Sequence, residues 1–111
     1  MMIRKLLISA LSVLLIAPVA AEAALHLYAD SDYKTWLGSF SNKMSKPRNM
    51  SSGANDRLSS FKNETGYYVA FYHDANGGGR CFTGDPKSKA AWFGFWDDNK
   101  VSSFQLGRSC G

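Results

Sequence analysis

Two short segments of the chain carry oxygen atoms at the same spacing. Each has two Asp or Asn residues, two spacers, two serines and then a phenylalanine: NDRLSSF at 55–61 and DNKVSSF at 98–104. Calcium is a hard cation that takes about six to eight oxygen ligands in flexible geometry. We call 55–60 and 98–103 the first and second serine segments and predict a calcium ion at each. The oxygens on offer are the side chains of Asn55 or Asp56, the Ser59 hydroxyl and the Arg57 carbonyl, then the side chains of Asp98 or Asn99, the Ser102 hydroxyl and the Lys100 carbonyl.

The alternative for both serine segments is a purely local one. Asp, Asn and Ser side chains commonly bond to nearby backbone groups and stabilise a turn without any ion. The sequence leaves this alternative open.

The N-terminus has the pattern of an export signal. Arg4 and Lys5 precede the apolar run 6–16, which is too short to span a bilayer, and small residues follow. Ala21-Glu22-Ala23 fits a cleavage site, with the triplet 19–21 as the second choice. We therefore predict a signal peptide over 1–23, a secreted (extracellular or periplasmic) mature chain from Ala24, and no stable membrane insertion of that mature chain.

The remaining residues, 24–111, have the length of one domain. Removing the signal peptide lowers the net charge from +4 to +3, because Arg4, Lys5 and Glu22 leave with it. A concentrated basic stripe is lacking, so nucleic acid is not an expected partner. Cys81 and Cys110 predict one disulfide in an exported domain, with two free thiols as the alternative. Together with two histidines they are too few for a zinc site.

A repeat of about 44 residues organises the chain. LHLYADSDYKTW (25–36) aligns with VAFYHDANGGGR (69–80) at an offset of 44, and the serine segments align at 43. Both copies open with the alternation of a β-strand and continue into turn-forming residues, while no stretch sustains a helical pattern. We predict an all-β sandwich of two Greek-key units, 24–65 and 66–111, with about four strands each.

The two units resemble the Greek-key motif of microbial βγ-crystallins, including the related I36 branch of peptidase inhibitors. That motif begins with an aromatic, four residues, a second aromatic, one residue and Gly. The first unit has Tyr28 and Tyr33 but Thr35 in place of Gly, and the second has Tyr72 and Gly79 but Gly77 in place of the aromatic. Because a β-branched residue rarely takes a positive φ, we expect the first hairpin to be wider or its turn to be built differently.

The resemblance also implies a ligand set for calcium. In the family, the second segment position, the carbonyl of the third and the hydroxyl of the fifth bind the ion, together with a carbonyl of the other unit's hairpin. This maps onto Asp56, Arg57 and Ser59 and onto Asn99, Lys100 and Ser102, with carbonyls near Ala29 and His73 as the crossing ligands. The second site is expected to be the weaker one, because Asn99 is neutral. No cofactor other than Ca²⁺ is expected.

Three functions are compatible with these observations, and catalysis is not among them. The two histidines lie in a predicted strand and a predicted turn with no nucleophile beside them, so we expect no enzyme. The first function is a secreted calcium-binding module with a structural role. The second, from the I36 resemblance, is inhibition of an extracellular metalloprotease through the polar, basic loop 41–53, whose alternative is a solvated connection. An antimicrobial, membrane-active role is the third and is weakly supported by the charge.

Aromatic residues are dense late in the second unit, at Trp92, Phe93, Phe95 and Trp96. Such residues supply buried area that a short domain needs. We expect this cluster to pack in the core and between the units, with an exposed ligand-binding face as the alternative.

Overall fold

The computed structural model describes residues 22–111. The predicted signal peptide lies outside the described residues apart from Glu22 and Ala23, which are exposed and belong to no strand. No helix in the described part of the chain is long and apolar enough to cross a membrane.

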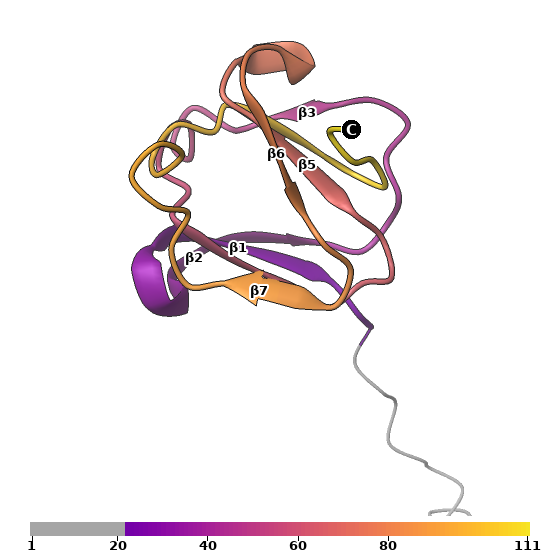
Figure 1. Cartoon of the computed structure of the whole chain (residues 1–111). Coiled ribbons are helices and arrows are strands. Elements are labelled where there is room, and N and C mark those ends of the chain that lie inside the picture. Colours follow the sequence, from indigo (N-terminus) through magenta and orange to yellow (C-terminus); the bar gives the residue numbers. More distant parts are fainter. Residues whose placement is uncertain (1–21) are drawn as a thin grey trace, which may run out of the picture.

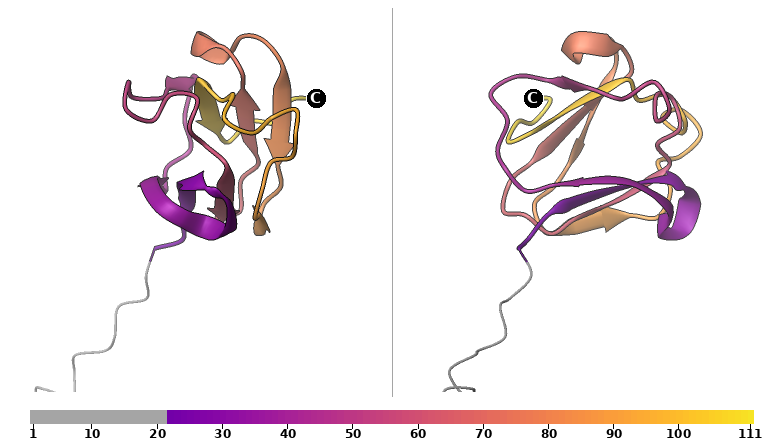
Figure 2. Two further views of the ribbon diagram at one scale, coloured as in Figure 1. Left: turned by 90° about the vertical axis from the view of Figure 1, so that its left-hand side faces the viewer. Right: turned by 180° about the vertical axis from the view of Figure 1, so that it is seen from behind.

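Two four-stranded antiparallel sheets pack face to face (Figures 1 and 2). The elements are β1 (Leu25–Asp30), η2 (Ser31–Tyr33), β2 (Lys34–Phe40), β3 (Arg48–Asn49), β4 (Ser60–Asn63), β5 (Val69–Tyr72), η3 (Ala75–Gly77), β6 (Cys81–Gly84), β7 (Ser88–Ala90) and β8 (Ser103–Leu106). One sheet has the order β2-β1-β4-β7 and the other β3-β8-β5-β6. The predicted all-β sandwich of two Greek-key units is confirmed.

Each sheet takes three strands from one unit and one strand from the other. The first unit supplies β1, β2 and β4 to one sheet and sends β3 across to the second, and the second unit sends β7 back to the first. Figure 1 shows this exchange as the orange β7 in the sheet of the indigo β1, where it pairs with β4, and the magenta β3 in the sheet of β5 and β6. Because of the exchange, neither unit can complete its sheet alone.

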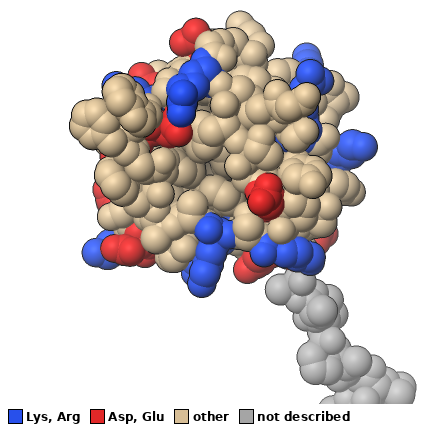
Figure 3. Space-filling model, in the orientation of Figure 1, with Lys and Arg blue, Asp and Glu red and all other residues tan. Residues whose placement is uncertain are grey.

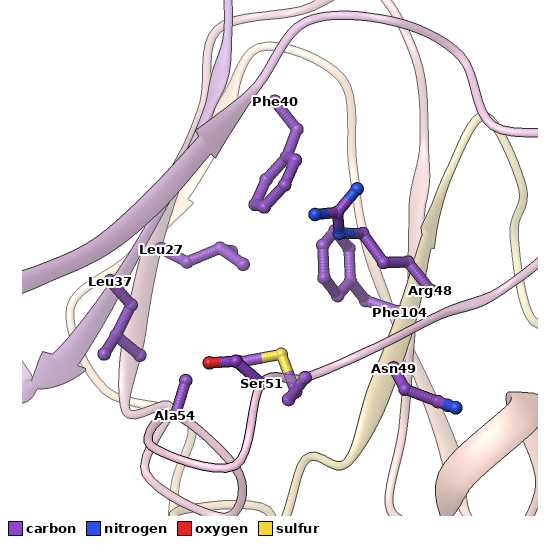
Figure 4. Close-up of a pocket in the computed structure, with 9 residues that line it drawn as sticks. Leu27, Leu37, Phe40, Arg48, Asn49, Ser51, Ala54 and Phe104 are labelled. Carbon is purple, nitrogen blue, oxygen red and sulfur yellow. The ribbon is translucent and has the colours of Figure 1, made fainter.

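The core lies between the sheets and repeats with the sequence. Its buried members come in pairs related by the 43- or 44-residue offset: Leu25 and Val69, Leu27 and Phe71, Leu58 and Val101, and Phe61 and Phe104, with Leu106 added. In β1, Leu25 and Leu27 alternate with half-buried neighbours as the period-two pattern predicts, whereas all four residues of β5 are buried. At one edge, between β2 and β3, the core opens into a cleft of about 390 Å³, where the guanidinium of Arg48 lies 5.0 Å from the ring centre of Phe40 (Figure 4).

A disulfide ties the C-terminal tail to the second sheet. Cys81, the first residue of β6, is bonded to Cys110 with the two Cα atoms 5.8 Å apart. The pairing predicted from the cysteine count is confirmed. On the chain-entropy model, closing a loop of this size removes roughly 3–4 kcal/mol of unfolded-state entropy.

The two hairpin tips have the same backbone although their sequences differ. Asp32 and Asn76 have φ of 59° and 56°, and Thr35 and Gly79 have φ of 52° and 74°. The expectation of a wider or differently built first hairpin is therefore wrong. A Cβ added at Gly79 would lie 2.6 Å from a carboxylate oxygen of Asp74, and in the first unit the Thr35 hydroxyl donates to the equivalent Asp30 at 2.6 Å. This hydrogen bond offsets the cost of a β-branched residue at positive φ.

The second hairpin also replaces the aromatic that its sequence lacks. In the first unit Tyr28 and Tyr33 pack edge to face with their ring centres 5.8 Å apart. In the second, Gly77 stands in place of the second tyrosine, and a Cβ there would lie 2.7 Å from Pro47 of the first unit's loop. Pro47 thus covers the second hairpin where the first hairpin uses its own tyrosine.

We expect Thr35→Val to lower the free energy of unfolding by about 1–2 kcal/mol, because it keeps the strained backbone and removes the hydroxyl that donates to Asp30. Thr35→Gly loses the same hydrogen bond but relieves the strain, so its stability should fall between those of Thr35→Val and the wild type. Urea unfolding of the three proteins measures the order. Equal stability of wild type and Thr35→Val would show that the hydroxyl does not offset the strain.

Candidate functional site

The two serine segments lie side by side although they are 43 residues apart in the sequence. The backbone N–H of Asp56 donates to the carbonyl of Val101 at 3.1 Å, and the N–H of Asn99 donates to the carbonyl of Leu58 at 3.1 Å. The two hydrogen bonds are equivalent under the offset of 43. They form a reciprocal junction between the two Greek-key units.

The residue types of the segments explain this junction. Asp56 and Asn99 have φ of 58° and 57°, a left-handed backbone that Asp and Asn adopt more readily than other residues with a side chain. Two residues later, Leu58 and Val101 are fully buried in the core. The apolar residue therefore fixes each segment to the sandwich, while the preceding Asp or Asn turns the backbone and directs its side chain to the other unit.

The oxygens of the segments pair across the junction rather than within one segment. The Ser59 hydroxyl donates to Oδ1 of Asn99 at 3.1 Å, and the Ser102 hydroxyl donates to Oδ1 of Asp56 at 3.1 Å. The family resemblance grouped Asp56 with Ser59 and Asn99 with Ser102 as ligands, whereas the hydrogen bonds join Ser59 to Asn99 and Ser102 to Asp56. The structure forms two crossed oxygen pairs, each with one hydroxyl and one Asp or Asn side chain from opposite units.

The serines also attach each segment to the hairpin of its own unit. The Ser59 and Ser102 N–H groups donate to the carbonyls of Tyr28 and Tyr72, each at 2.9 Å. The hydroxyls of the second serines, Ser60 and Ser103, donate to the hairpin carbonyls of Asp30 and Asp74, each at 2.6 Å. The serines of each segment are thus bonded to the hairpin of their own unit, while Asp56 and Asn99 bond to the other unit through both backbone and side chain.

The other predicted ligands adjoin the residues of the crossed pairs or the hairpin tyrosines in the sequence. Asn55 is exposed, and Ala29 is buried at the end of β1, directly before Asp30. Asp98 adjoins Asn99, and its Oδ1 is the one buried side-chain oxygen or nitrogen of residues 22–111 without a hydrogen-bond partner. Within the described part of the chain, no hydrogen bond outside the strands reaches the carbonyls of Arg57, His73 or Lys100.

These groups suit a hard cation better than a transition metal. The donors are hydroxyl, amide, carboxylate and carbonyl oxygens, which calcium prefers, and they include a buried carboxylate oxygen with no partner. Residues 22–111 contain no group of three or more His, Cys, Asp or Glu side chains that could hold a metal. The oxygen donors present therefore fit calcium.

Residues 22–83, more than half of the chain, match the family model of peptidase inhibitor family I36. The chain belongs to peptidase inhibitor family I36. The family is one of inhibitors rather than enzymes, in agreement with the sequence. No curated protein matches the chain.

Solved structures of microbial βγ-crystallin domains share the fold of this I36 domain. A domain from Flavobacterium johnsoniae is 24% identical with a TM-score of 0.59, and covers 78% of this chain and 96% of its own. An archaeal βγ-crystallin is 27% identical with a TM-score of 0.59, covering 78% and 99%. A domain from Clostridium beijerinckii is 25% identical with a TM-score of 0.61, covering 76% and 97%. The resemblance to the βγ-crystallin fold is confirmed.

The aromatic cluster of the I36 domain is mostly exposed, against expectation. Only Phe93 packs against the core, with its ring centre 4.9 Å from that of Phe82 and 5.4 Å from that of Phe71. Trp92, Phe95 and Trp96 are 54%, 77% and 73% exposed. The prediction of core packing is therefore wrong for these three, because the loop directs only the side chain of Phe93 toward the core.

The loop 41–53 is held along its length by backbone hydrogen bonds. The N–H of Met44 donates to the carbonyl of Leu106 at 2.8 Å, the N–H of Met50 donates to the carbonyl of Ser102 at 2.9 Å, and β3 pairs with β8 between them. Lys43, Lys46 and Arg48 remain exposed. The loop is an ordered edge of the second sheet with basic side chains on its surface.

Asp97 anchors the segment that leads into the second serine segment. Its Oδ1 accepts hydrogen bonds from Nε of Arg80 at 2.7 Å and from Nε2 of His73 at 2.9 Å, and its side chain is only 12% exposed. Burial by itself raises the pKa of Asp97, but the hydrogen bonds and positive charge of Arg80 and His73 outweigh it and hold that pKa below its ordinary value. Sequence analysis did not single out Asp97, because an Asp next to another Asp does not indicate which partners its side chain will contact.

We expect Asp97→Asn to lower the free energy of unfolding by about 1–3 kcal/mol at pH 7, because charged hydrogen bonds to a buried group are lost. A carboxylate whose pKa is lower in the folded state contributes stability above its unfolded pKa of about 4, and that stability is lost as the pH falls through the folded pKa. The difference in free energy of unfolding between the wild type and Asp97→Asn should therefore become smaller at acid pH. Urea unfolding between pH 7 and pH 2 measures it.

Asp85→Asn, at an exposed turn, is the matched control and should leave stability within about 0.5 kcal/mol of wild type. A constant difference between Asp97→Asn and wild type from neutral to acid pH would contradict the role of the ionised carboxylate.

Proposed function

We propose that the protein binds calcium at the two crossed oxygen pairs and that the ions stabilise the junction between the Greek-key units. The observation that carries the proposal is the reciprocal pairing of Ser59 with Asn99 and of Ser102 with Asp56. In each pair, two oxygen atoms from opposite units converge at 3.1 Å. An ion between them would replace one weak hydrogen bond by several ionic contacts.

A further ligand group supports each site. The carbonyls of Arg57 and Lys100 lie two residues before Ser59 and Ser102, and those of Ala29 and His73 follow the hairpin tyrosines whose carbonyls accept from the same serines. Asn55 and Asp98, at the first segment position, would act through water or from the second shell of oxygens. The unpartnered Oδ1 of Asp98 favours a cation beside the second serine segment.

The two sites should differ in affinity in the sense opposite to the one predicted from the sequence. Because the pairs are crossed, the carboxylate of Asp56 serves the site of Ser102, and the neutral amide of Asn99 serves the site of Ser59. Ligand charge is a main determinant of calcium affinity. We therefore assign the tighter site to Ser102 and Asp56.

The biological role that fits this chemistry is structural. The domain has a disulfide, which is typical of proteins that leave the cytosol, and the N-terminal sequence has the pattern of a signal peptide. Calcium is abundant outside cells, so a secreted domain of this size would gain stability from both the disulfide and the ions. We infer that the mature chain is secreted and functions with calcium bound.

Inhibition of an extracellular peptidase is the second function that we propose, and membership in peptidase inhibitor family I36 favours it. Inhibitors act by presenting a pre-organised surface to the substrate cleft, so that little conformational freedom is lost on binding. The hydrogen-bonded loops of this sandwich meet that requirement. Calcium binding and inhibition are compatible, because the ions would rigidify the same loops.

We expect calcium to raise the thermal midpoint of the protein. A native-state ligand at about 100 times its dissociation constant adds about 2.7 kcal/mol, or roughly 10–20 °C for a domain of this size. Asp56→Ala and Ser102→Ala should abolish the tighter binding step, and Asn99→Ala and Ser59→Ala the weaker one. Calorimetric calcium titration of each variant, together with thermal melts, makes the measurement.

Asp85→Asn removes one negative charge away from both sites and should leave both binding steps unchanged. The crossed assignment would be overturned if Asp56→Ala and Ser59→Ala removed the same step. Unchanged heats and an unchanged midpoint of the wild type in millimolar calcium would remove the calcium proposal altogether.

A further inference from the structure

Three large aromatic side chains form an exposed surface on the segment between β7 and β8. We call Trp92, Phe95 and Trp96 the aromatic surface; they are 54%, 77% and 73% exposed, and the rings of Phe95 and Trp96 pack edge to face at 5.3 Å. Monomeric proteins rarely leave clustered aromatics in water without a binding role. The solvation cost of this surface therefore indicates a partner.

The backbone that carries the aromatic surface is fixed. Phe93 inserts into the core between the exposed rings, and its N–H donates to the carbonyl of Ser59 at 3.0 Å. Asp97, which follows Trp96, is held by Arg80 and His73. The segment is thus anchored on both sides of Phe95 and Trp96, so its conformational entropy is already lost before any partner binds.

The shape of this region suits a concave partner. The segment bulges from one side of the sandwich between β7 and β8, at the left of Figure 1, and Figure 3 shows uncharged atoms projecting at the same upper left edge. The three rings border an open hollow of about 490 Å³ whose other walls are Asp98, Asn99 and Lys100. Protruding aromatics on a rigid segment fill pockets in partner proteins and supply most of the binding energy there.

We propose that the aromatic surface is the part of the protein that enters the substrate cleft of its target peptidase, and that the target has subsites for large apolar side chains. The proposal rests on the inhibitory function proposed above. It replaces the basic loop 41–53 as the contact segment, since Lys46 and Arg48 would instead suit a peptidase that selects basic side chains. A lipid bilayer is a poorer partner, because Asp98 balances the charge of Lys100 beside the rings and the hollow offers anionic headgroups no net positive charge.

The experiment measures inhibition constants of the calcium-loaded wild-type protein against thermolysin and chymotrypsin, which select apolar side chains, and against trypsin, which selects basic ones. We expect inhibition of at least one of the first two enzymes, and a loss of about tenfold or more for Phe95→Ala and Trp96→Ala. Trp36→Ala is the matched control: Trp36 is 64% exposed but belongs to β2 and does not line the hollow. Lys46→Ala tests the basic loop.

The outcomes distinguish the inhibitory function itself from the assignment of the aromatic surface as the contact segment. Inhibition that survives in Phe95→Ala and Trp96→Ala, or that is directed at trypsin and lost in Lys46→Ala, overturns the assignment of the aromatic surface and leaves the inhibitory function standing. A wild type that inhibits none of the three enzymes overturns both. Binding of the wild type to phosphatidylglycerol vesicles that is lost in Trp96→Ala, without any effect on inhibition, assigns the aromatic surface to membranes and overturns the proposal.

Thermal melts and far-ultraviolet circular dichroism show whether each variant is folded. Because Phe95 and Trp96 are more than two-thirds exposed, their truncation should shift the midpoint by no more than that of Trp36→Ala. Phe93→Ala, in contrast, is expected to destabilise the domain.

Discussion

The reciprocal junction between the two serine segments is the contact on which the other features of this protein depend. Two backbone hydrogen bonds, Asp56 to Val101 and Asn99 to Leu58, join loops that are far apart in the sequence. They hold only because Leu58 and Val101 are buried and because Asp56 and Asn99 tolerate a left-handed backbone. The junction places the crossed oxygen pairs, and it also fixes the residues on either side of the second segment.

The exchange of β3 and β7 between the sheets makes the junction a property of the whole domain. Each unit needs a strand from the other to complete its sheet, so the two loops cannot separate without breaking sheet hydrogen bonds as well. An ion at each crossed pair would add a bond between the same two units. The aromatic surface ends one residue before the second serine segment, with Asp97 between them, so the order that the junction imposes extends to the surface we assign to the peptidase.

The repeat in the sequence was sufficient to predict the fold. The offsets of 43 and 44 residues, the alternation in 25–28 and 69–72 and the cysteine pair led to the sandwich, the two units and the disulfide, because each depends on local residue types or on simple counting. The equivalence of Thr35 and Gly79 was not predicted. It depends on a hydrogen bond to Asp30, which compensates a conformation that residue type alone disfavours.

The residues that join the two serine segments were among those singled out from the sequence, but the hydrogen bonds between them were not predicted. The segments identified the oxygen donors, but which Asp or Asn meets which Ser depends on how the two units pack, and a pattern within one segment has no information about that. The predicted core packing of the aromatic cluster was wrong for a related reason. All four residues at 92, 93, 95 and 96 are large aromatics, and only Phe93 is placed to pack against the rings of β4, β5 and β6.

A crystal structure of the calcium-loaded protein tests the central claim most directly, through the identity of the side chains that share an ion. The account predicts one ion bound by the Ser59 hydroxyl and the Asn99 side chain, and a second bound by the Ser102 hydroxyl and the Asp56 side chain. An ion coordinated by Ser59 and Asp56 of the same segment, or serine segments that hold no ion in saturating calcium, would contradict it.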